Sequence, residues 1–229
     1  MPLVAARIGC KTDVLQLTPQ IGGKVTSELI DRIVVSGQRA RLHANCRVLD
    51  RHCRLNLDSV PVEPAYFAAL AAASRRLGAE AYTLHPGYTI NCTRQQLADN
   101  LDHLEQIFEC PVGVEAMYPN RMRPYHLADW SGYGWLLESG VRYAIDLSHI
   151  HILATHTNTV DHGLVRALLQ SDRLLELHIS SNDGFSDSHG LSFQQEWWHD
   201  LLTITHPETV IFCESDCRAL LRYKSLQDL

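Results

Sequence analysis

The chain has 229 residues, with 20 basic and 26 acidic side chains and a formal net charge of −6, which argues against a protein that coats nucleic acid. Hydrophobic residues make up 45% and charged residues 20%, a composition that excludes disordered and collagen-like chains. No run approaches the roughly 18 apolar residues that a membrane span needs, so we expect no membrane partner. Seven cysteines without a C-x-x-C pair, and an N-terminus without a signal-peptide pattern, predict free thiols in the cytoplasm.

Short apolar segments that end in polar residues recur along the chain, as expected of strands buried on both faces of a parallel sheet. In chain order, the predicted strands are Leu3–Ile8, Ala40–Ala44, Ala81–His85, Val112–Ala116, Arg142–Asp146, Leu174–Ser180 and Thr209–Cys213. The segment 11–39 is ambiguous, because it fits either a helix over Thr26–Ile33 or a further strand over Ile33–Ser36.

Amphipathic segments separate these strands. The predicted helices are Pro64–Leu77, Thr93–Phe108, Asp161–Gln170, Ser192–Leu202 and Asp216–Tyr223. In the second of them, Thr93 and Gln96 match a capping box, and apolar residues recur every three to four positions behind it. Strand–helix alternation at roughly 30-residue intervals predicts parallel βα units with right-handed crossovers. Without a linker or a charge block, one domain over residues 1–229 is the simplest interpretation.

Nearly every predicted strand ends in a side chain that can bind a metal ion. The carboxyl ends of parallel strands meet at one face of the sheet, where such residues would converge. The candidate ligands are His43, His85, Glu115, Asp146, His149, His178 and Glu214 at strand ends, with Asp187 and His189 in the loop after the sixth strand. This set of five His, two Asp and two Glu suits Zn, Mn or Fe and is large enough for two or three ions.

The remaining histidines are expected to lie on helix faces or in exposed loops and not to bind metal: His52, His103, His126, His156, His162, His199 and His206. His151 is undecided, since on an extended backbone it would share the side of His149. Cys46 follows His43 by three positions, but the other donors suffice without it. Cys213 is expected to point away from the site, into the layer between sheet and helices.

Five segments occur in an order and spacing that resemble a known superfamily: LHPG (84–87), VEAMYP (114–119), IDLSH (145–149), ELHISSNDGFSDSHG (176–190) and FCES (212–215). Over roughly residues 40–215 the chain resembles the xylose isomerase-like TIM barrels, which include endonuclease IV and many sugar isomerases and epimerases. The resemblance implies an α/β fold of the TIM (β/α) barrel type. Because no eighth βα unit is evident, we expect the barrel to be incomplete or open, or closed by the N-terminal segment.

The resemblance also implies roles for the nine candidate ligands. In endonuclease IV the corresponding set holds three zinc ions, and the glutamates that match Glu115 and Glu214 bridge metals. In the epimerases a smaller subset holds one Mn or Co, and the two glutamates exchange a substrate proton. Glu115 and Glu214 are therefore the expected catalytic residues, and zinc is the favoured ion, with Mn, Co and Fe as alternatives.

Four functions remain open. The full set of nine residues favours a metal-dependent phosphoester hydrolase similar to endonuclease IV. The acidic charge, and Ala-Asn-Cys after His43 where that enzyme has an aromatic residue, favour a sugar or sugar-phosphate isomerase or epimerase. An iron-dependent oxidase that modifies a peptide and a non-catalytic metal-carrying module are further alternatives. The expected partner is a small phosphorylated or sugar-like substrate, or damaged DNA. Trp130, Tyr133 and Trp135 would either stack on a substrate ring or pack the fourth helix against the barrel.

Overall fold

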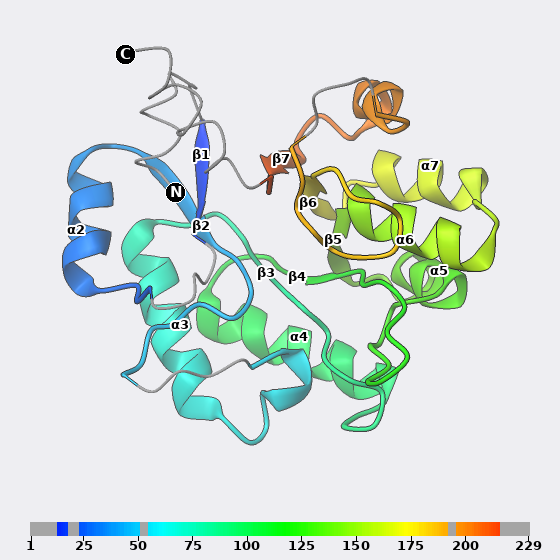
Figure 1. Ribbon diagram of the computed structural model, residues 1–229. Helices are drawn as coiled ribbons and strands as arrows, with labels where there is room; N and C mark the ends of the chain where they lie inside the picture. The colour runs from blue at the N-terminus through cyan, green and yellow to red at the C-terminus, as the bar shows by residue number, and fades with distance from the viewer. Residues whose placement is uncertain (1–12, 18–22, 51–54, 192–195, 216–229) are drawn as a thin grey trace, which may run out of the picture.

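The computed structural model describes residues 13–17, 23–50, 55–191 and 196–215, which form a curved set of parallel strands surrounded by helices (Figure 1). The strands are β1 (Val14–Leu17), β2 (Arg39–Leu42), β3 (Tyr82–Leu84), β4 (Val112–Glu115), β5 (Arg142–Asp146), β6 (Leu174–Ile179) and β7 (Val210–Cys213). The helices are α2 (Ser27–Val35), α3 (Pro64–Leu77), α4 (Arg94–Phe108), α5 (Trp130–Glu138), α6 (Leu147–Thr157) and α7 (His162–Gln170), with 3₁₀ turns η1 (Leu57–Ser59) and η2 (His199–Ile204).

The strands follow one another in space in the same order as in the chain. β1 pairs with β2, and β3 to β7 form a five-stranded sheet, with every pairing parallel. A bridge between His43 and Thr83 joins the two sheets, and the Ala44 amide donates to the Thr83 carbonyl at 2.9 Å. The described residues contain no ladder between β7 and β1. The α/β barrel that the sequence predicted is therefore confirmed as an open half-barrel.

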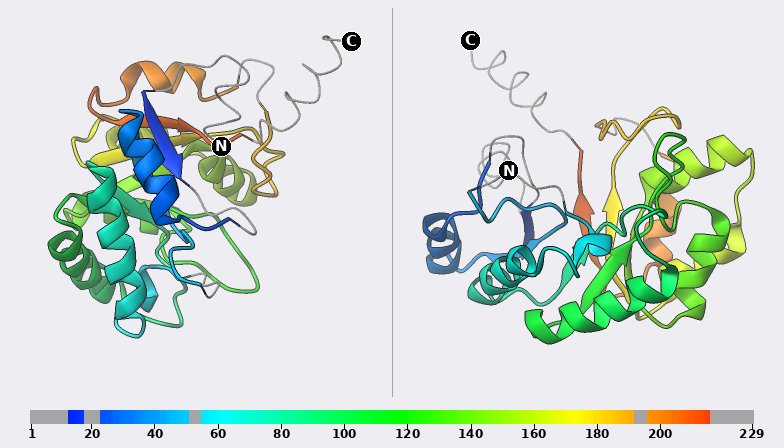
Figure 2. Two further views of the ribbon diagram at one scale, coloured as in Figure 1. Left: turned by 90° about the vertical axis from the view of Figure 1, so that its left-hand side faces the viewer. Right: turned by 90° about the horizontal axis from the view of Figure 1, so that it is seen from below.

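The alternation of side chains along each strand separates an apolar face from a polar one. The residues that immediately precede the strand-end candidates are apolar and completely buried in the hydrophobic core: Leu42, Leu84, Val114, Ile145 and Leu177. The helices lie outside the strands, as both views of Figure 2 show. Burial of the apolar face against these helices leaves the alternate positions directed to the barrel interior.

Helix α4 shows how the local sequence positions these layers. The Gln96 amide donates to Thr93 Oγ1 at 3.2 Å and the Thr93 amide donates to Gln96 Oε1 at 2.8 Å, so the predicted capping box is present. Leu97, Leu101 and Leu104 form the buried stripe behind it. This cap and stripe fix where α4 starts and which face it turns to the core.

Most predicted elements are found within two residues of their expected ends, with several differences. The helix alternative for the segment before β2 is confirmed as α2, because Thr26 Oγ1 caps it by accepting from the Leu29 amide; a strand over residues 33–36 is wrong. Strand β1 was not predicted. The expected strand over 3–8 and helix over 216–223 lie outside the described residues, and 192–202 is described only from 196, with η2 in place of a helix end. None of the described helices is long and apolar enough to cross a membrane.

Candidate metal centre

The Glu115 carboxylate lies at the centre of a buried cluster at the carboxyl ends of the strands. Its Oε2 lies 3.1 Å from His43 Nε2 and 3.3 Å from His85 Nε2. Its Oε1 lies 3.3 Å from His178 Nδ1 and 3.6 Å from His149 Nδ1. One carboxylate at the end of β4 thus faces four imidazoles, two at each oxygen.

A second part of the cluster surrounds the other nitrogen of His149. The ring's Nδ1 contacts the Ala116 carbonyl oxygen at 2.9 Å. Its Nε2 therefore faces outward, 3.7 Å from Asp146 Oδ2 and 3.5 Å from Asp187 Oδ2. His189 Nε2 lies 3.4 Å from the same Asp187 oxygen. The two aspartates and two histidines of this part come from the end of β5, the start of α6 and the loop after β6.

Glu214, which follows β7, closes the cluster. Its Oε1 lies 3.5 Å from His178 Nδ1, and its Oε2 lies 3.8 Å from His189 Nδ1. Potential ligand atoms gather within 4.8 Å of one another in three overlapping groups: His43, His178 and Glu214; His43, His85 and Glu115; and Glu115, Asp146 and His149. The structure thus brings all nine predicted residues together in one cluster.

The loop after β3 is held by a close backbone approach. The Asp58 carboxylate accepts from the Tyr88 amide at 2.9 Å and from Asn91 Nδ2 at 2.7 Å. A Cβ at Gly87 would lie 2.0 Å from Asp58 Cγ, and Gly87 has a φ of +90°. Only glycine fits here, which explains the glycine of the H-P-G sequence that begins at His85.

The loop after β6 is closed at its base by backbone pairing. Ser181 and Gly190 exchange two hydrogen bonds of 3.0 and 2.7 Å. Within the loop, Asp183 Oδ1 accepts from the Phe185 and Ser186 amides. These contacts return the chain so that Asp187 and His189 face the strand ends.

The charges in the cluster oppose one another strongly. Burial alone would raise the pKa of the Glu115 carboxyl, but the charges of His178 and His43 and their hydrogen bonds hold that pKa well below its usual range. Burial raises the pKa of Asp146, assisted by the negative charges of Glu214 and Glu115 and opposed by His149. The environment therefore favours the ionised form of the central carboxylate at neutral pH.

The histidines respond in the opposite direction. Burial lowers the pKa of His149, but Asp146, Asp187 and Glu115 raise it to about 10. A hydrogen bond with Asp187 raises the pKa of His189 to about 9. Without a metal ion, the surrounding carboxylates thus attract protons to these rings, as they would attract any cation.

The hydrogen bonding of the buried polar atoms in the cluster shows whether cations would fit here. Among the candidate ligands, five buried atoms have no hydrogen-bond partner within the described residues, although burial of an unpaired polar atom is costly. They are Glu115 Oε2, Asp146 Oδ2, Asp187 Oδ1, His189 Nδ1 and Glu214 Oε1; six other such atoms belong to residues outside the ligand set. The five are oxygen or nitrogen atoms of kinds that suit zinc and related dications. The residues present therefore fit a group of metal ions.

Sequence reasoning missed a second polar layer, beneath the first. Glu176, Thr83 and Arg41 are buried two positions before the candidate ligands of the same strands, and Gln16 reaches the same interior from β1. A period of two places them on the same face as those ligands. The signal was thus present as charged or polar residues inside otherwise apolar strands.

The other histidines lie outside this cluster wherever the structure describes them; His52 is outside the described residues. His103, His156 and His162 are exposed as expected, and His199 and His206 are partly buried. The expectation of an exposed position is wrong for His126, which is buried and has its Nε2 2.9 Å from the Cys92 carbonyl oxygen. The assumption of an extended backbone at His151 is also wrong, because Asp146 caps α6 directly and places His151 in that helix.

The structure also places the cysteines and aromatic residues that the sequence analysis considered near the site. Cys46 is buried and its thiol donates to the Leu17 carbonyl at 3.0 Å, away from the cluster. Cys213 is exposed, so the expected packing between sheet and helices is wrong. Tyr133 is buried in α5 and donates to the Met117 carbonyl at 3.1 Å, which favours packing over substrate stacking. Two other aromatic rings lie beside the cluster: Tyr118, centred 4.8 Å from the His149 ring, and Phe212, centred 6.2 Å from the His178 ring.

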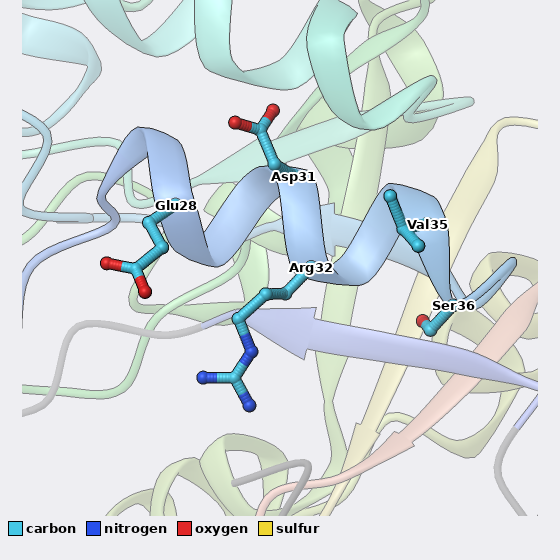
Figure 3. A pocket seen from close by; sticks show the side chains of 5 residues that line it. All are labelled: Glu28, Asp31, Arg32, Val35 and Ser36. Atoms are coloured by element: carbon cyan, nitrogen blue, oxygen red, sulfur yellow. The ribbon is translucent and has the colours of Figure 1, made fainter.

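A shallow hollow on the outer surface of α2 contains none of the cluster residues. It is lined by Glu28, Asp31, Arg32, Val35 and Ser36. Figure 3 shows Arg32 and Asp31 on opposite sides of the helix, and Asp31 pairs with Arg76 of α3. The chemistry of the strand ends is therefore not repeated there.

Comparisons with known proteins identify the fold. No protein-family profile matches the sequence, and no match was found among curated proteins. Solved structures do match: a D-tagatose 3-epimerase-like protein has 16% identity and a TM-score of 0.64, covering 95% of this chain and 88% of that one. The IolI protein with a bound zinc atom has 14% identity and a TM-score of 0.65, covering 99% and 87%. The AP endonuclease, family 2, of Brucella melitensis has 13% identity and a TM-score of 0.62, covering 94% and 86%.

The chain has the xylose isomerase-like barrel fold. The resemblance found in its motifs is therefore confirmed at the level of structure. At these identities the likeness establishes the fold, while the reaction has to be argued from the residues of the site. The neighbours named here are described as an epimerase-like protein, a zinc-binding protein and an endonuclease, and so include both leading functional alternatives.

Proposed function

We propose that this protein is a divalent-metal-dependent phosphoester hydrolase whose barrel mouth binds at least two metal ions. The observation that carries the proposal is the position of Glu115. Its Oε2 faces Nε2 of His43 and of His85 while its Oε1 faces Nδ1 of His178, at 3.1–3.3 Å. A carboxylate with separate nitrogen ligands at each oxygen is arranged to bridge two ions.

The charge of the cluster supports more than one ion. Four buried or partly buried carboxylates belong to it: Glu115, Asp146, Asp187 and Glu214. A single dication would leave half of this negative charge uncompensated in a poorly solvated place, which is costly. Two dications would balance it, and a third would provide positive charge for an anionic substrate.

Each part of the centre has a role in this proposal. Clustered dications, when bound, polarise phosphoryl oxygens and make water more acidic. His43, His85 and Glu115 would hold one ion; His178 and Glu214, with Glu115, a second; and His149, Asp187 and His189 a third. Asp146 lies between the last two groups. Glu214 would also orient the attacking water, because its buried Oε1 has no hydrogen-bond partner.

The exposed side of the cluster indicates where substrate would enter. The side chains of His85 and His189 are 27% and 36% exposed, whereas His43, His149 and His178 are at most 5% exposed. A phosphate group would therefore approach between the loops that follow β3 and β6. The net charge of −6 favours a small phosphorylated molecule over intact duplex DNA.

A second candidate is a sugar or sugar-phosphate epimerase with one metal ion. It is favoured by the approach of two glutamates to the same ring, since Glu115 Oε1 and Glu214 Oε1 lie 3.3 and 3.5 Å from His178 Nδ1. Two carboxylates on opposite sides of a bound substrate could exchange the proton of a carbon atom next to a carbonyl.

Metal content and turnover together decide between these functions. Protein purified without chelators would be analysed by mass spectrometry for metals and assayed with bis(p-nitrophenyl) phosphate, sugar phosphates and abasic-site DNA. We expect two or three zinc ions per chain and phosphoester hydrolysis that a chelator abolishes and zinc restores. One Mn or Co per chain with solvent deuterium incorporated into a ketose would establish the epimerase. Bound iron with oxygen consumption would establish the oxidase, and metal without any turnover a binding module.

A matched pair of variants ties this activity to the cluster. His85→Asn removes one ring that faces Glu115, and His103→Asn removes an exposed histidine of α4. We expect the first to lose metal and activity and the second to retain both. Equal metal content in the two variants would contradict the proposed centre.

A further inference from the structure

Two residues below the cluster contact His43 and His178 through the ring nitrogens that face away from Glu115. His43 Nδ1 lies 2.7 Å from Thr83 Oγ1, and His178 Nε2 lies 3.2 Å from Glu176 Oε2. Thr83 and Glu176 also contact each other, at 2.6 Å between Oγ1 and Oε2. All four side chains are buried, so water does not compete for these contacts.

The contact between Thr83 and Glu176 determines the direction of the hydrogen bond from His43. An ionised carboxylate only accepts, so the single hydroxyl hydrogen of Thr83 must be donated to Glu176. The hydroxyl oxygen then has no hydrogen left for the ring, and His43 Nδ1 must carry the hydrogen of the 2.7 Å contact. The neutral ring of His43 is thereby left with an unprotonated Nε2, which is the nitrogen that lies 3.1 Å from Glu115.

The same rule gives the opposite form for His178. Glu176 has no hydrogen to donate, so His178 Nε2 must carry one, and in the neutral ring that binds a metal ion, Nδ1 is the unprotonated nitrogen that faces Glu115 and Glu214. Gln16 Nε2 is the atom placed 3.0 Å from His178 Nε2. A flip of this amide exchanges its nitrogen and oxygen and presents the oxygen as an acceptor to the Nε2–H form. Arg41 Nη1 forms a buried ion pair with Glu176 Oε1 at 3.3 Å, and a positive charge at this distance favours the ionised carboxylate.

We propose that Thr83 and Glu176 are positioning residues that hold His43 and His178 in opposite tautomers, so that each ring turns an unprotonated nitrogen toward the metal centre. The inference rests on the proposed function only for the presence of metal ions and is independent of the reaction. It identifies residues outside the ligand set on which the affinity of the site depends, because hydrogen bonds behind a ligating histidine fix its ring and tautomer.

Thr83 allows a closely matched test. Thr83→Val keeps the shape of the side chain and removes the hydroxyl, whereas Thr83→Ser keeps the hydroxyl. Zinc affinity would be measured by competition with a chromophoric chelator on the parent and both variants. We expect roughly 10-fold weaker binding in Thr83→Val and recovery in Thr83→Ser. A purely structural role would lower the melting temperature of Thr83→Val without changing its zinc affinity, and that result would overturn the proposal.

The tautomers themselves give a second readout that does not depend on activity. Long-range ¹H–¹⁵N spectra of the zinc-loaded parent distinguish protonated from unprotonated ring nitrogens. We expect His43 in the Nδ1–H form and His178 in the Nε2–H form, with the His43 signals changed in Thr83→Val and restored in Thr83→Ser. The reverse assignment for either ring would overturn the proposal.

Glu176→Gln keeps the test decisive if Thr83→Val fails to fold. Its amide retains the size of the carboxylate but loses the charge paired with Arg41, and we again expect roughly 10-fold weaker zinc binding. Unchanged affinity would overturn the proposal. Failure of the proposed function is recognised separately. A parent protein that binds zinc tightly but hydrolyses no phosphoester would contradict the hydrolase proposal and leave the proposed role of Thr83 and Glu176 standing. A parent protein that binds no zinc would contradict both proposals.

Discussion

Glu115 is the side chain whose chemistry is hardest to replace, because both of its oxygens face histidines in a buried place. Glu115→Gln keeps the volume but turns one acceptor oxygen into a donor amide that cannot bind a cation. We expect a folded protein whose activity is lower by on the order of 100-fold or more. Glu214→Gln should behave similarly, and Glu138→Gln on the exposed end of α5 should match the parent. Full activity in Glu115→Gln, measured alongside circular dichroism, would contradict its assigned role.

Cys46 provides the opposite expectation close to the same site. Burial raises the pKa of its thiol to about 12, and the thiol already donates to the Leu17 carbonyl. A protonated, hydrogen-bonded thiol is a poor metal ligand. Cys46→Ser should therefore retain the metal content of the parent, measured by mass spectrometry. Loss of one equivalent would show that the cysteine contributes to the centre.

His126 should make the stability of the protein depend on pH. Burial lowers its pKa, although the hydrogen bond with the Cys92 carbonyl acts in the opposite direction. The unfolded chain then binds the proton more readily, so the stabilisation by neutral His126 is present above the ordinary histidine pKa of about 6.5 and is lost as the pH falls.

The comparison with His126→Gln isolates this contribution, because all other titrating groups cancel. Near pH 7.5 we expect the parent to be more stable by roughly 1 kcal/mol, the value of a buried hydrogen bond. The advantage should shrink as the pH is lowered to about 5, in urea titrations of both proteins. A constant difference across this range would show that His126 titrates equally in the folded and unfolded states.

The sequence allowed a prediction of those site residues that lie at the carboxyl ends of strands. His43, His85 and Glu115 each follow an apolar run directly, so their convergence follows from the geometry of a parallel sheet. Glu176 and Thr83 lie inside such runs, where a polar residue is as compatible with a strand edge as with a polar interior. Their role depends on contacts between β3 and β6 that no local pattern contains.

At the level of elements, the turn after β3 sets the position of His85. A Cβ at Gly87 would overlap the Asp58 carboxylate and would require an unfavourable φ of +90°. Gly87→Ala should reduce the free energy of unfolding by roughly 2 kcal/mol or more. Gly134→Ala is the control, because a Cβ there meets nothing within 4 Å inside α5, and we expect it to stabilise by up to roughly 1 kcal/mol. Equal urea midpoints for the two variants would contradict this account of the turn.

The elements that sequence reasoning missed have local causes. β1 carries Gln16 toward the interior between two leucines, so its apolar run is interrupted. α6 starts at Leu147 without a loop, because Asp146 ends β5 and caps the helix at the same time by accepting from the Ser148 amide at 2.6 Å. Because Asp146 ends the strand and caps the helix, no turn residues separate β5 from α6 in the sequence.

The molecule as a whole should depend on its metal for stability. A ligand at 1,000 times its dissociation constant contributes about 4 kcal/mol per site, and in a chain of this size 1 kcal/mol corresponds to about 2–4 °C. Removal of metal by a chelator should thus lower the melting temperature by on the order of 10 °C, and zinc should restore it. Scanning calorimetry of His85→Asn should show a smaller difference. A melting temperature that chelation leaves unchanged would argue against occupied sites.

The candidate ligands come from strands β2 to β7 and the segments after them, from His43 to Glu214. The ribosome synthesises this chain from its N-terminus, so the early histidines exist long before the carboxylate that completes the cluster. Until Glu214 has emerged, the site lacks a member, and an ion bound earlier would be held by an incomplete set. The complete cluster is therefore a late product of synthesis: the group of His43, His85 and Glu115 is present once β4 has been made, whereas the group that includes Glu214 requires the chain through β7.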